Sequence, residues 1–345
     1  LGRALLPLAR NAADRAVARE HLSRAAALHT ELLGAQDPLV LDDRHFLAWA
    51  MKESQDFAAA EAEYVDVLAR RREVLGAESL PVAETLNNLG QLYAHPRVAR
   101  YAEAEELLRE ALRIRQTHGA VSEDVATSQS NLGSLLRDRA AALLPAAQPA
   151  GAEDDPAARL NTAAALLAEA EPLLATSLDA RRQRFGEEDF RSVVSMNKLG
   201  LLHRTAGQLA QAQGRTDEAR QRFDAALDLL ERTLALRQRV LPPAHPHMAV
   251  SKINLGLVQA DRGALQEAET WLRAGLQDAL SAGNTGYIRA ALRRLRALLA
   301  EQGRAADAET LSRLTVMELR AMIERTGSGD GADDLRALAA EIESQ

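Results

Sequence analysis

Cysteine is absent from the 345 residues, and aromatic residues make up only 3% of them. The absence of cysteine excludes disulfide bonds, thiol chemistry and thiolate metal sites. No apolar run reaches the roughly 20 residues that a membrane-spanning helix needs, and there is no signal-peptide pattern. Runs of Val, Ile and Thr with alternating polarity are also missing, so the sequence offers no candidate β-strands.

What remains is a composition dominated by Ala, Leu, Arg and Glu, which all favour helices. Because 47% of the residues are hydrophobic, the chain can bury a large core. The formal net charge of -7 argues against a nucleic-acid partner. We therefore predict an all-α protein with no nucleic-acid partner, no membrane partner and a cytoplasmic location.

A Leu-Gly pair recurs inside apolar segments. It lies in ETLNNLGQLY (84–93), SNLGSLL (130–136), NKLGLLH (197–203) and INLGLVQ (253–259). Gly90 and Gly133 are 43 residues apart, and a repeat unit of about 42 residues with two insertions accounts for the other spacings.

Each unit is predicted to be a pair of helices, the first of which carries the Leu-Gly pair. The second helices are predicted from apolar residues three and four apart, at 57–76, 101–119, 223–242 and 265–283. A glycine on the buried face lets two helix backbones approach closely. Small residues in Glu-Ala-Glu triplets, at Ala104, Ala170 and Ala268, are expected to face these glycines from the second helix.

These segments resemble the tetratricopeptide repeat (TPR). Leu-Gly-x-x-Tyr at 89–93, followed by Tyr101 and Ala104, matches its signature positions. The match is nearer to the kinesin-light-chain type, whose long second helices end in Arg-x-x-x-Leu-Gly before a His-Pro turn. The counterparts here are RREVLGAESLPVAETLNNLG (71–90) and RQRVLPPAHPHMAVSKINLG (237–256). This resemblance implies a right-handed superhelical α-solenoid of antiparallel helix pairs. The excess of 39 Arg over three Lys indicates a bacterial origin, and the start at Leu1 indicates a fragment.

The resemblance covers roughly residues 1 to 325 and gives the domain organisation. We predict a partial first repeat at 1–34, a TPR solenoid at 35–325, a Gly-rich linker at 326–334 and a terminal helix or tail at 335–345. Because Leu1-Gly2 matches the middle of a first helix, we expect further sequence upstream in the natural protein.

Two insertions are predicted to be long helical hairpins, near 135–178 and 201–223. The second adds 14 residues, which is about two turns in each of two antiparallel helices. Gly214 would lie at its tip. In the first hairpin, Asp154 or Asp155 is expected to cap a helix that starts at Pro156.

A search for chemistry in the sequence finds none. No two histidines lie four residues apart on a helix, and no nucleophile elbow, P-loop or dinucleotide-binding glycine pattern occurs. The linker lacks the ligand spacing of a calcium loop. We therefore predict no catalytic residues, no cofactor and no metal.

The predicted function lies on a surface. In proteins that this chain resembles, first helices line a concave groove, and asparagine there can both donate to and accept from a peptide backbone. The predicted peptide-binding residues are Asn88, Gln91, Asn131, Ser134, Asn197, Lys198, Asn254, Arg293 and Arg294. A partner segment with acidic residues near one end would fit the basic end of this groove.

Alternatives remain open. One alternative is that the asparagines join one first helix to the next and only hold the stack. Another is that the arginines lie on a solvated terminal helix, and a third is that Phe46 and Trp49 belong to the core rather than to the groove. We predict a non-enzymatic scaffold that binds a partner peptide or helix. The alternative is the regulatory or sensor arm of a larger bacterial enzyme, such as a Ser/Thr kinase, a caspase-like protease or a signalling ATPase. A homo-oligomer formed through the 135–178 hairpin is a further hypothesis.

Overall fold

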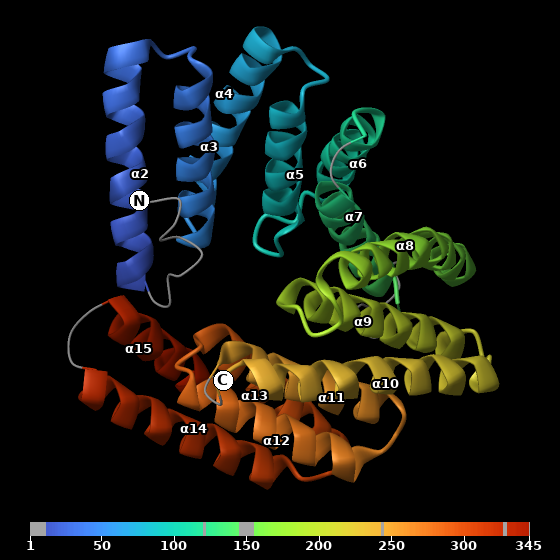
Figure 1. Cartoon of the computed structure of the whole chain (residues 1–345). Coiled ribbons are helices and arrows are strands. Elements are labelled where there is room, and N and C mark those ends of the chain that lie inside the picture. The colour runs from blue at the N-terminus through green and yellow to red at the C-terminus, as the bar shows by residue number, and fades with distance from the viewer. Residues whose placement is uncertain (1–11, 120–121, 145–154, 243–244, 327–329, 345) are drawn as a thin grey trace. The chain divides into compact units, whose positions relative to one another are not determined.

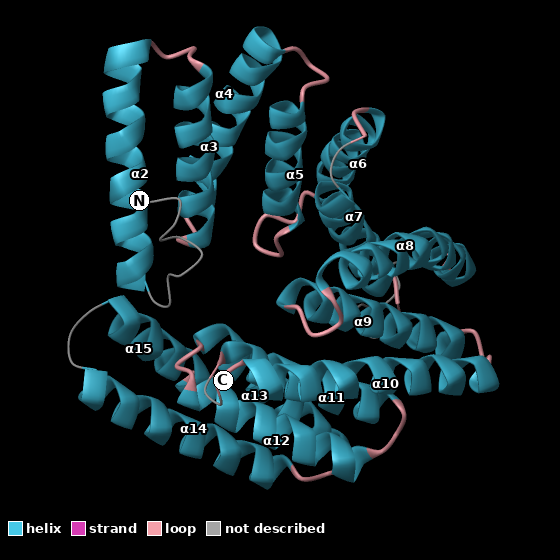
Figure 2. Cartoon of the chain, viewed as in Figure 1, coloured by secondary structure: helices cyan, strands magenta, loops and turns pink. Residues whose placement is uncertain are grey.

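The fold is built from helices alone. The computed structural model describes residues 12–119, 122–144, 155–242, 245–326 and 330–344 (Figure 1). These residues form 14 helices and no strand (Figure 2), which confirms the predicted all-α class. The chain divides into two compact units, and the boundary in the sequence falls between Arg139 and Ala140.

Unit 1 holds the first half of the repeats. Its helices are α2 (Ala12–Leu33), α3 (Pro38–Glu53), α4 (Phe57–Leu75), α5 (Leu80–Ala94), α6 (Tyr101–Thr117) and α7 (Ser122–Ala142), whose last turn passes into unit 2. Neighbours along the chain pack together: α2 on α3, α3 on α4, α4 on α5 and α5 on α6. This is the arrangement of stacked helix pairs expected of a repeat protein.

Unit 2 continues the same pattern with longer helices. They are α8 (Pro156–Phe185), α9 (Phe190–Ala212), α10 (Thr216–Val240), α11 (Pro246–Asp261), α12 (Leu265–Ser281), α13 (Thr285–Glu301), α14 (Ala305–Thr326) and α15 (Asp330–Glu343). Each packs on its neighbour from α8 through to α15. In chain order, first helices (α3, α5, α7, α9, α11 and α13) alternate with second helices (α4, α6, α8, α10, α12 and α14).

Aspartate caps start several of these helices. The side chains of Asp37, Asp155 and Asp189 each accept a hydrogen bond of 2.9 Å from the backbone N–H two residues later. Such caps satisfy a helix N–H that has no partner within the helix. The cap at Asp155, with Pro156 in the first turn of α8, confirms the prediction made for this position.

Glycine sets the distance between paired helices. A Cβ atom added at Gly90 would lie 2.8 Å from Leu108 Cγ and 3.3 Å from the carbonyl oxygen of Ala104. At Gly256 the same atom would lie 2.7 Å from Leu272 Cγ and 3.1 Å from the carbonyl oxygen of Ala268. The predicted close approach is therefore confirmed for the α5–α6 and α11–α12 pairs.

The α9–α10 pair has the predicted extra length. α9 has 23 residues and α10 has 25, against 15 and 17 in α5 and α6. A second glycine, Gly207, lies in the added part of α9, and a Cβ atom there would be 2.5 Å from the ring of Phe223. Gly214 lies at the tip with a φ of 72°, a conformation that glycine adopts without strain.

A buried arginine joins each of the second helices α4, α6, α8 and α10 to the next first helix. Arg71, Arg115, Arg181 and Arg237 are at most 7% exposed. Their Nη1 atoms donate to hydroxyl oxygens on the next helix, at Thr85 (2.8 Å), Ser128 (2.8 Å), Ser195 (2.8 Å) and Ser251 (2.7 Å). Because a buried charged donor is costly without an acceptor, these bonds fix how consecutive repeats stack.

The last helix begins earlier than the sequence suggests. α15 starts at Asp330, within the segment predicted to be a linker. Carboxylates in its first turns favour a helix N-terminus, and Leu335, Leu338 and Ile342 bury themselves in the core formed by α12 to α14. The tail is thus a packed terminal helix. The predicted chain start inside a repeat lies outside the described residues.

Candidate functional site

The predicted site residues all lie on first helices. Asn88 and Gln91 are on α5, Asn131 and Ser134 on α7, Asn197 and Lys198 on α9, Asn254 on α11, and Arg293 and Arg294 on α13. Because the two units are distinct bodies, the residues form two separate sets, one on α5 and α7 in unit 1 and one on α9, α11 and α13 in unit 2.

Asparagine side chains connect successive first helices in both units. Asn131 Nδ2 donates to Asn87 Oδ1 at 3.1 Å, between α7 and α5. Asn254 Nδ2 donates to Asn197 Oδ1, also at 3.1 Å, between α11 and α9. Asn87 is only 2% exposed and Asn254 only 6%. Part of the hydrogen-bonding capacity of these amides is therefore used to hold the stack, which was the structural alternative for them.

Asn88 is engaged more completely. Its Nδ2 contacts His45 Nε2 at 3.0 Å, and its Oδ1 accepts from Asn87 at 3.3 Å and from Gln91 at 3.4 Å. His45 is fully buried in α3. Since one amide oxygen has two lone pairs, Asn88 has little capacity left for a ligand.

A small pocket opens beside these amides in unit 1. It has a volume of about 150 Å³ and contains three of the predicted residues. Its polar lining consists of Gln91, His95, Asn131, Ser134 and Asp138. The pocket has roughly the volume of a single side chain, so it suits an anchor residue of a longer ligand rather than a free metabolite.

The pocket offers mainly acceptor groups. Burial lowers the pKa of His95, which keeps its imidazole neutral near pH 7, and its Nδ1 accepts from the backbone N–H of Arg97. Ser134 Oγ donates to the carbonyl oxygen of Ser130 at 2.7 Å and can still accept a bond. A ligand that donates N–H groups suits this lining.

Unit 2 gathers guanidinium groups on its first helices. Arg204 Nε on α9 donates to Asp261 Oδ2 on α11 at 2.6 Å, and Gln208 Nε2 donates to the same oxygen at 3.0 Å. Arg293 and Arg294 are consecutive residues of α13, and Arg204 lies near enough to affect the pKa of Arg294. Partial burial lowers the pKa of Arg294, as do the neighbouring charges of Arg204 and Arg293, whereas Asp261 raises it.

Asp261 thus pairs with only one of the guanidinium groups near it. Asp261 is already engaged by Arg204 and Gln208, and Arg294 forms no ion pair with any described residue. The cluster around Asp261 therefore has a net positive charge of 2 from Arg204, Arg293 and Arg294 against Asp261. An added anionic group would relieve the repulsion among these guanidiniums.

Phe46 and Trp49 face the core rather than a groove. Both rings pack against a buried cluster formed by Ala18, Leu22 and Ala50, between α2 and α3. Trp49 Nε1 donates to Glu53 Oε1 at 3.2 Å. These aromatic side chains therefore belong to the packing of α3 on the N-terminal helix, which was one of the two interpretations given for them.

The part of the chain that the structure describes contains no group of three or more His, Cys, Asp or Glu side chains placed to hold a metal ion. None of the described helices combines the length and hydropathy needed to cross a bilayer.

The buried carboxylate of Glu269 forms ion pairs with Arg304 and Arg273, and these guanidinium groups lower its pKa.

Comparison with known families decides the nature of the repeats. Residues 53–116 and 213–281 match the tetratricopeptide repeat family. These two segments are TPR repeats. The two matched segments take in α4 to α6 in unit 1 and α10 to α12 in unit 2. No curated protein sequence matches the chain.

Solved structures agree on the fold. BtubC (BKLC) from P. vanneervenii is 22% identical, with a TM-score of 0.52 over 77% of this chain and 91% of that one. A putative kinesin light chain with TPR-like repeats from Podosopora anserina is 20% identical, with a TM-score of 0.47 over 70% and 96%. A Rap protein complexed with Competence and Sporulation Factor is 13% identical, with a TM-score of 0.49 over 94% and 85%. BtubC, the one of these three with a TM-score above 0.5, shares the fold of stacked helix pairs.

Several residues that shape the site were not predicted from the sequence. Asn87 and His45 organise the amides in unit 1, and Asp261 and Gln208 organise the guanidiniums in unit 2. A signal existed for Asp261, because it lies on the same helical stripe as Asn254. No sequence signal indicates His45, whose burial depends on how the TPR helices stack.

Proposed function

We propose that the chain is a non-enzymatic protein–protein interaction scaffold that binds a peptide or helix of a partner along the first helices of its TPR repeats. The residues proposed to form the binding surface, by contact with the partner or by orienting the residues that contact it, are Asn88, Gln91, Asn131, Ser134, Asn197, Lys198, Asn254, Arg293 and Arg294. TPR repeats and a polar first-helix face in each unit support the proposal.

The observation that carries the proposal is the excess of guanidinium groups around Asp261. Arg294 is partly desolvated and has two arginines and one committed carboxylate near it. A folded protein gains little from such an arrangement by itself, because like charges repel. A partner carboxylate at Arg294 turns the repulsion into charge-assisted hydrogen bonds, so the ligand of unit 2 is an acidic segment.

Unit 1 binds the backbone of the partner peptide, whereas unit 2 binds its acidic side chains. The carbonyl oxygens of Gln91 and Asn131 have no hydrogen bond to another described residue, and they lie at the pocket between α5 and α7. An extended peptide presents N–H groups that these oxygens can accept. Asn88 and Asn254 contribute by orienting the neighbouring amides, since their own N–H groups are engaged.

The test is selection from a random peptide library on the whole chain, followed by fluorescence anisotropy with the selected peptides. We expect the selected peptides to be enriched in Asp and Glu, and their affinity to fall as salt rises. Arg294→Ala should weaken binding at least tenfold, and Gln91→Ala by a smaller factor. The matched control is Arg220→Ala on the second helix α10, where the side chain is 67% exposed.

Two results would overturn the proposal. One is a peptide pool without acidic enrichment. The other is an affinity that Arg294→Ala and Arg220→Ala reduce equally, because the α13 guanidinium would then have no special part in recognition. Circular dichroism of each variant ensures that a lost affinity does not reflect unfolding.

A further inference from the structure

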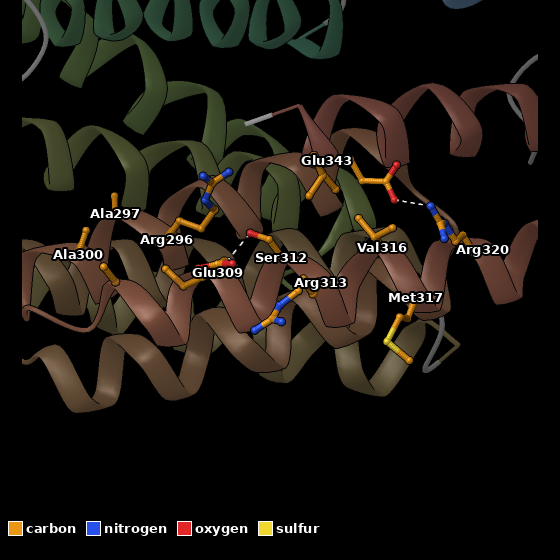
Figure 3. Close-up of a pocket in the computed structure, with 13 residues that line it drawn as sticks. Arg296, Ala297, Ala300, Glu309, Ser312, Arg313, Val316, Met317, Arg320 and Glu343 are labelled. Carbon is orange, nitrogen blue, oxygen red and sulfur yellow. Dashed lines mark hydrogen bonds and ion pairs between the residues drawn. The ribbon is translucent and has the colours of Figure 1, made fainter.

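An open groove lies at the end of unit 2, beside α13 and α14 (Figure 3). It has a volume of about 930 Å³. Most of its lining residues belong to α14, in the segment from Ala305 to Arg320. α13 contributes Arg296, Ala297 and Ala300, and α15 contributes Ile342 and Glu343. The groove is therefore walled mainly by two neighbouring helices, with the third side open.

The position of a third helix is only partly filled here. In the preceding repeat α13 packs on both α12 and α11, and α15 packs on both α14 and α13 in the same way. However, α15 has 14 residues against 22 in α14, and its last turn meets α14 at Arg320, through an ion pair with Glu343 at 2.5 Å. The groove follows α14 for about 22 Å, which is about four helical turns. A helix is therefore the shape that fits this space.

The lining residues of α14 form one stripe along the helix. Ala305, Glu309, Ser312 and Val316 recur at intervals of three and four residues, so they lie on one face. Met317 also lines the groove, at the outer edge of this stripe, and is 65% exposed. Exposed apolar groups beside an apolar recess are typical of an interaction surface. A ligand that covers the stripe would bury Met317.

The charged lining residues favour an acidic ligand. They comprise three arginines and two glutamates: Arg296, Arg313, Arg320, Glu309 and Glu343. Arg320 and Glu343 neutralise each other. Arg296 on α13 and Arg313 at the outer edge of α14 lie on opposite sides of the stripe (Figure 3). A ligand with carboxylates on both sides of an apolar face would therefore meet a guanidinium on each side.

The groove continues the guanidinium surface of α13. Arg293 lies one turn before Arg296 and Ala297, so it is on the same face of α13 as the groove lining. Arg289, one turn earlier, is already paired with Glu341 of α15 at 2.8 Å. Arg293 therefore lies between that ion pair and the groove, and its neighbour in the sequence is Arg294, at which an acidic segment is proposed to bind.

We propose that this groove binds an amphipathic helix of the acidic partner, with an apolar stripe against α14 and carboxylates on both flanks. This rests on the proposed function, because it takes the acidic partner of unit 2 as given and adds its conformation and a second contact. The apolar side chains pack on the alanines and on Met317, and the carboxylates pair with Arg293 and Arg313. This is recognition of a helix in a groove, in which apolar burial adds affinity that salt does not screen.

The test uses a designed peptide of about 16 residues, the length of about four helical turns. It carries Leu three and four residues apart on one face and Glu on both sides of that face. Fluorescence anisotropy measures its binding to the full chain. A peptide with Gln in place of every Glu lacks the charges, and a peptide with a central Pro cannot form the whole helix. Both should bind at least fivefold more weakly than the Glu peptide.

Two residues of α14 provide matched variants. Met317 and Leu314 are both exposed apolar residues, at 65% and 55%, but of the two only Met317 lines the groove. Met317→Glu should weaken binding of the Glu peptide at least tenfold, because it places a carboxylate against an acidic ligand. Leu314→Glu should leave the affinity unchanged. Circular dichroism confirms that each variant is folded.

The outcomes separate this proposal from the proposed function. The groove proposal is overturned by a Glu peptide that does not bind, by Gln or Pro peptides that bind equally well, or by equal effects of Met317→Glu and Leu314→Glu. Acidic peptides from the library that bind through Arg294 and are unaffected by Met317→Glu also overturn it, but they leave the proposed function in place. A library pool without acidic enrichment overturns the proposed function itself.

Discussion

At the scale of single residues, helix distance depends on positions where a methyl group has no room. Gly256 on α11 lies against both a side chain and a carbonyl oxygen of α12. A backbone carbonyl cannot rotate away as the end of a side chain can. The helix axes must separate if this space is filled, and that would weaken the packing of Leu272 and Ala268 along the pair.

Gly256→Ala is therefore expected to lower the free energy of unfolding by about 1–3 kcal/mol, the usual cost of overpacking. The control is Gly286→Ala in the first turn of α13, where the nearest atom to an added Cβ is 3.4 Å away. There alanine should raise the free energy of unfolding by about 0.5–1 kcal/mol, because it reduces the entropy of the unfolded chain. Urea denaturation measures both changes. Equal effects at the two glycines would contradict this account of the α11–α12 contact.

The asparagines show where residue-level prediction reaches its limit. The sequence places Asn88, Asn131 and Asn254 next to Leu-Gly pairs and identifies the face on which they lie. It does not say how much of each amide is used within the stack, because that depends on a second residue on another helix. Asn88 has its partner in the buried ring of His45, 43 positions away in the sequence.

At the scale of elements, the start of α11 is sensitive to protonation. His245 caps this helix, accepting a bond from the N–H of His247 at 3.2 Å. The ring of His247 lies between Phe190 and His245, with centroids 5.3 Å and 5.0 Å away. Burial, together with the charges of Arg237 and His245, lowers the pKa of His247 to about 4.

A histidine whose pKa is lowered on folding stabilises the protein only while it is neutral. The unfolded state takes up a proton near pH 6.5, and the folded state does so only near pH 4, so stability is lost as pH falls through this window. We expect the free energy of unfolding to fall by about 1–2 kcal/mol between pH 7 and pH 5 from this group alone.

His247→Phe keeps an aromatic ring at this position and removes the titrating group. Its unfolding free energy, measured by urea denaturation at several pH values, should vary less between pH 7 and pH 5 than that of the wild type. His95 and His203, whose pKa values burial also lowers, are present in both proteins. They therefore contribute equally to the pH dependence of the unfolding free energy in each. Parallel pH profiles of the two proteins would refute the assignment to His247.

The lengths of helices were predictable where the number of residues between equivalent positions of two repeats could be counted. The extra residues after Gly200 correctly indicate two longer helices, because a hairpin insertion must lengthen both of its arms. Gly207 was not anticipated, although it does in the added turns what Gly90 does in α5. The start of α15 was missed because Gly-rich composition suggested a linker, whereas burial of Leu335 and Leu338 decides the matter.

At the scale of the whole molecule, the repeat explains both what the sequence predicted and what it did not. A period of about 42 residues is a local signal, so TPR helix pairs follow from the sequence alone. The contacts between repeats depend on residues such as Arg71, Arg115, Arg181 and Arg237, which the sequence shows only as part of a helix-end pattern. Their hydroxyl partners, 13 or 14 positions later, become clear once consecutive helices are seen side by side.

The stacking of repeats also predicts which helices are destabilised by a substitution at one interface between repeats. Stability in such proteins is close to a sum over repeats and the interfaces between neighbours. Ser251→Ala removes the hydroxyl that accepts a hydrogen bond from Arg237 between α10 and α11. It should lower the free energy of unfolding by about 1–3 kcal/mol, because a buried guanidinium loses an acceptor.

Hydrogen exchange of the Ser251→Ala variant, followed by mass spectrometry, should show faster exchange in α10, α11 and the helices packed on them, and unchanged rates in α3 and α4. Thr270→Ala is the control, since its exposed hydroxyl bonds only to Gln266 of its own helix. A uniform rise across both units would mean that the chain opens as one cooperative body and that the interfaces between repeats do not act locally.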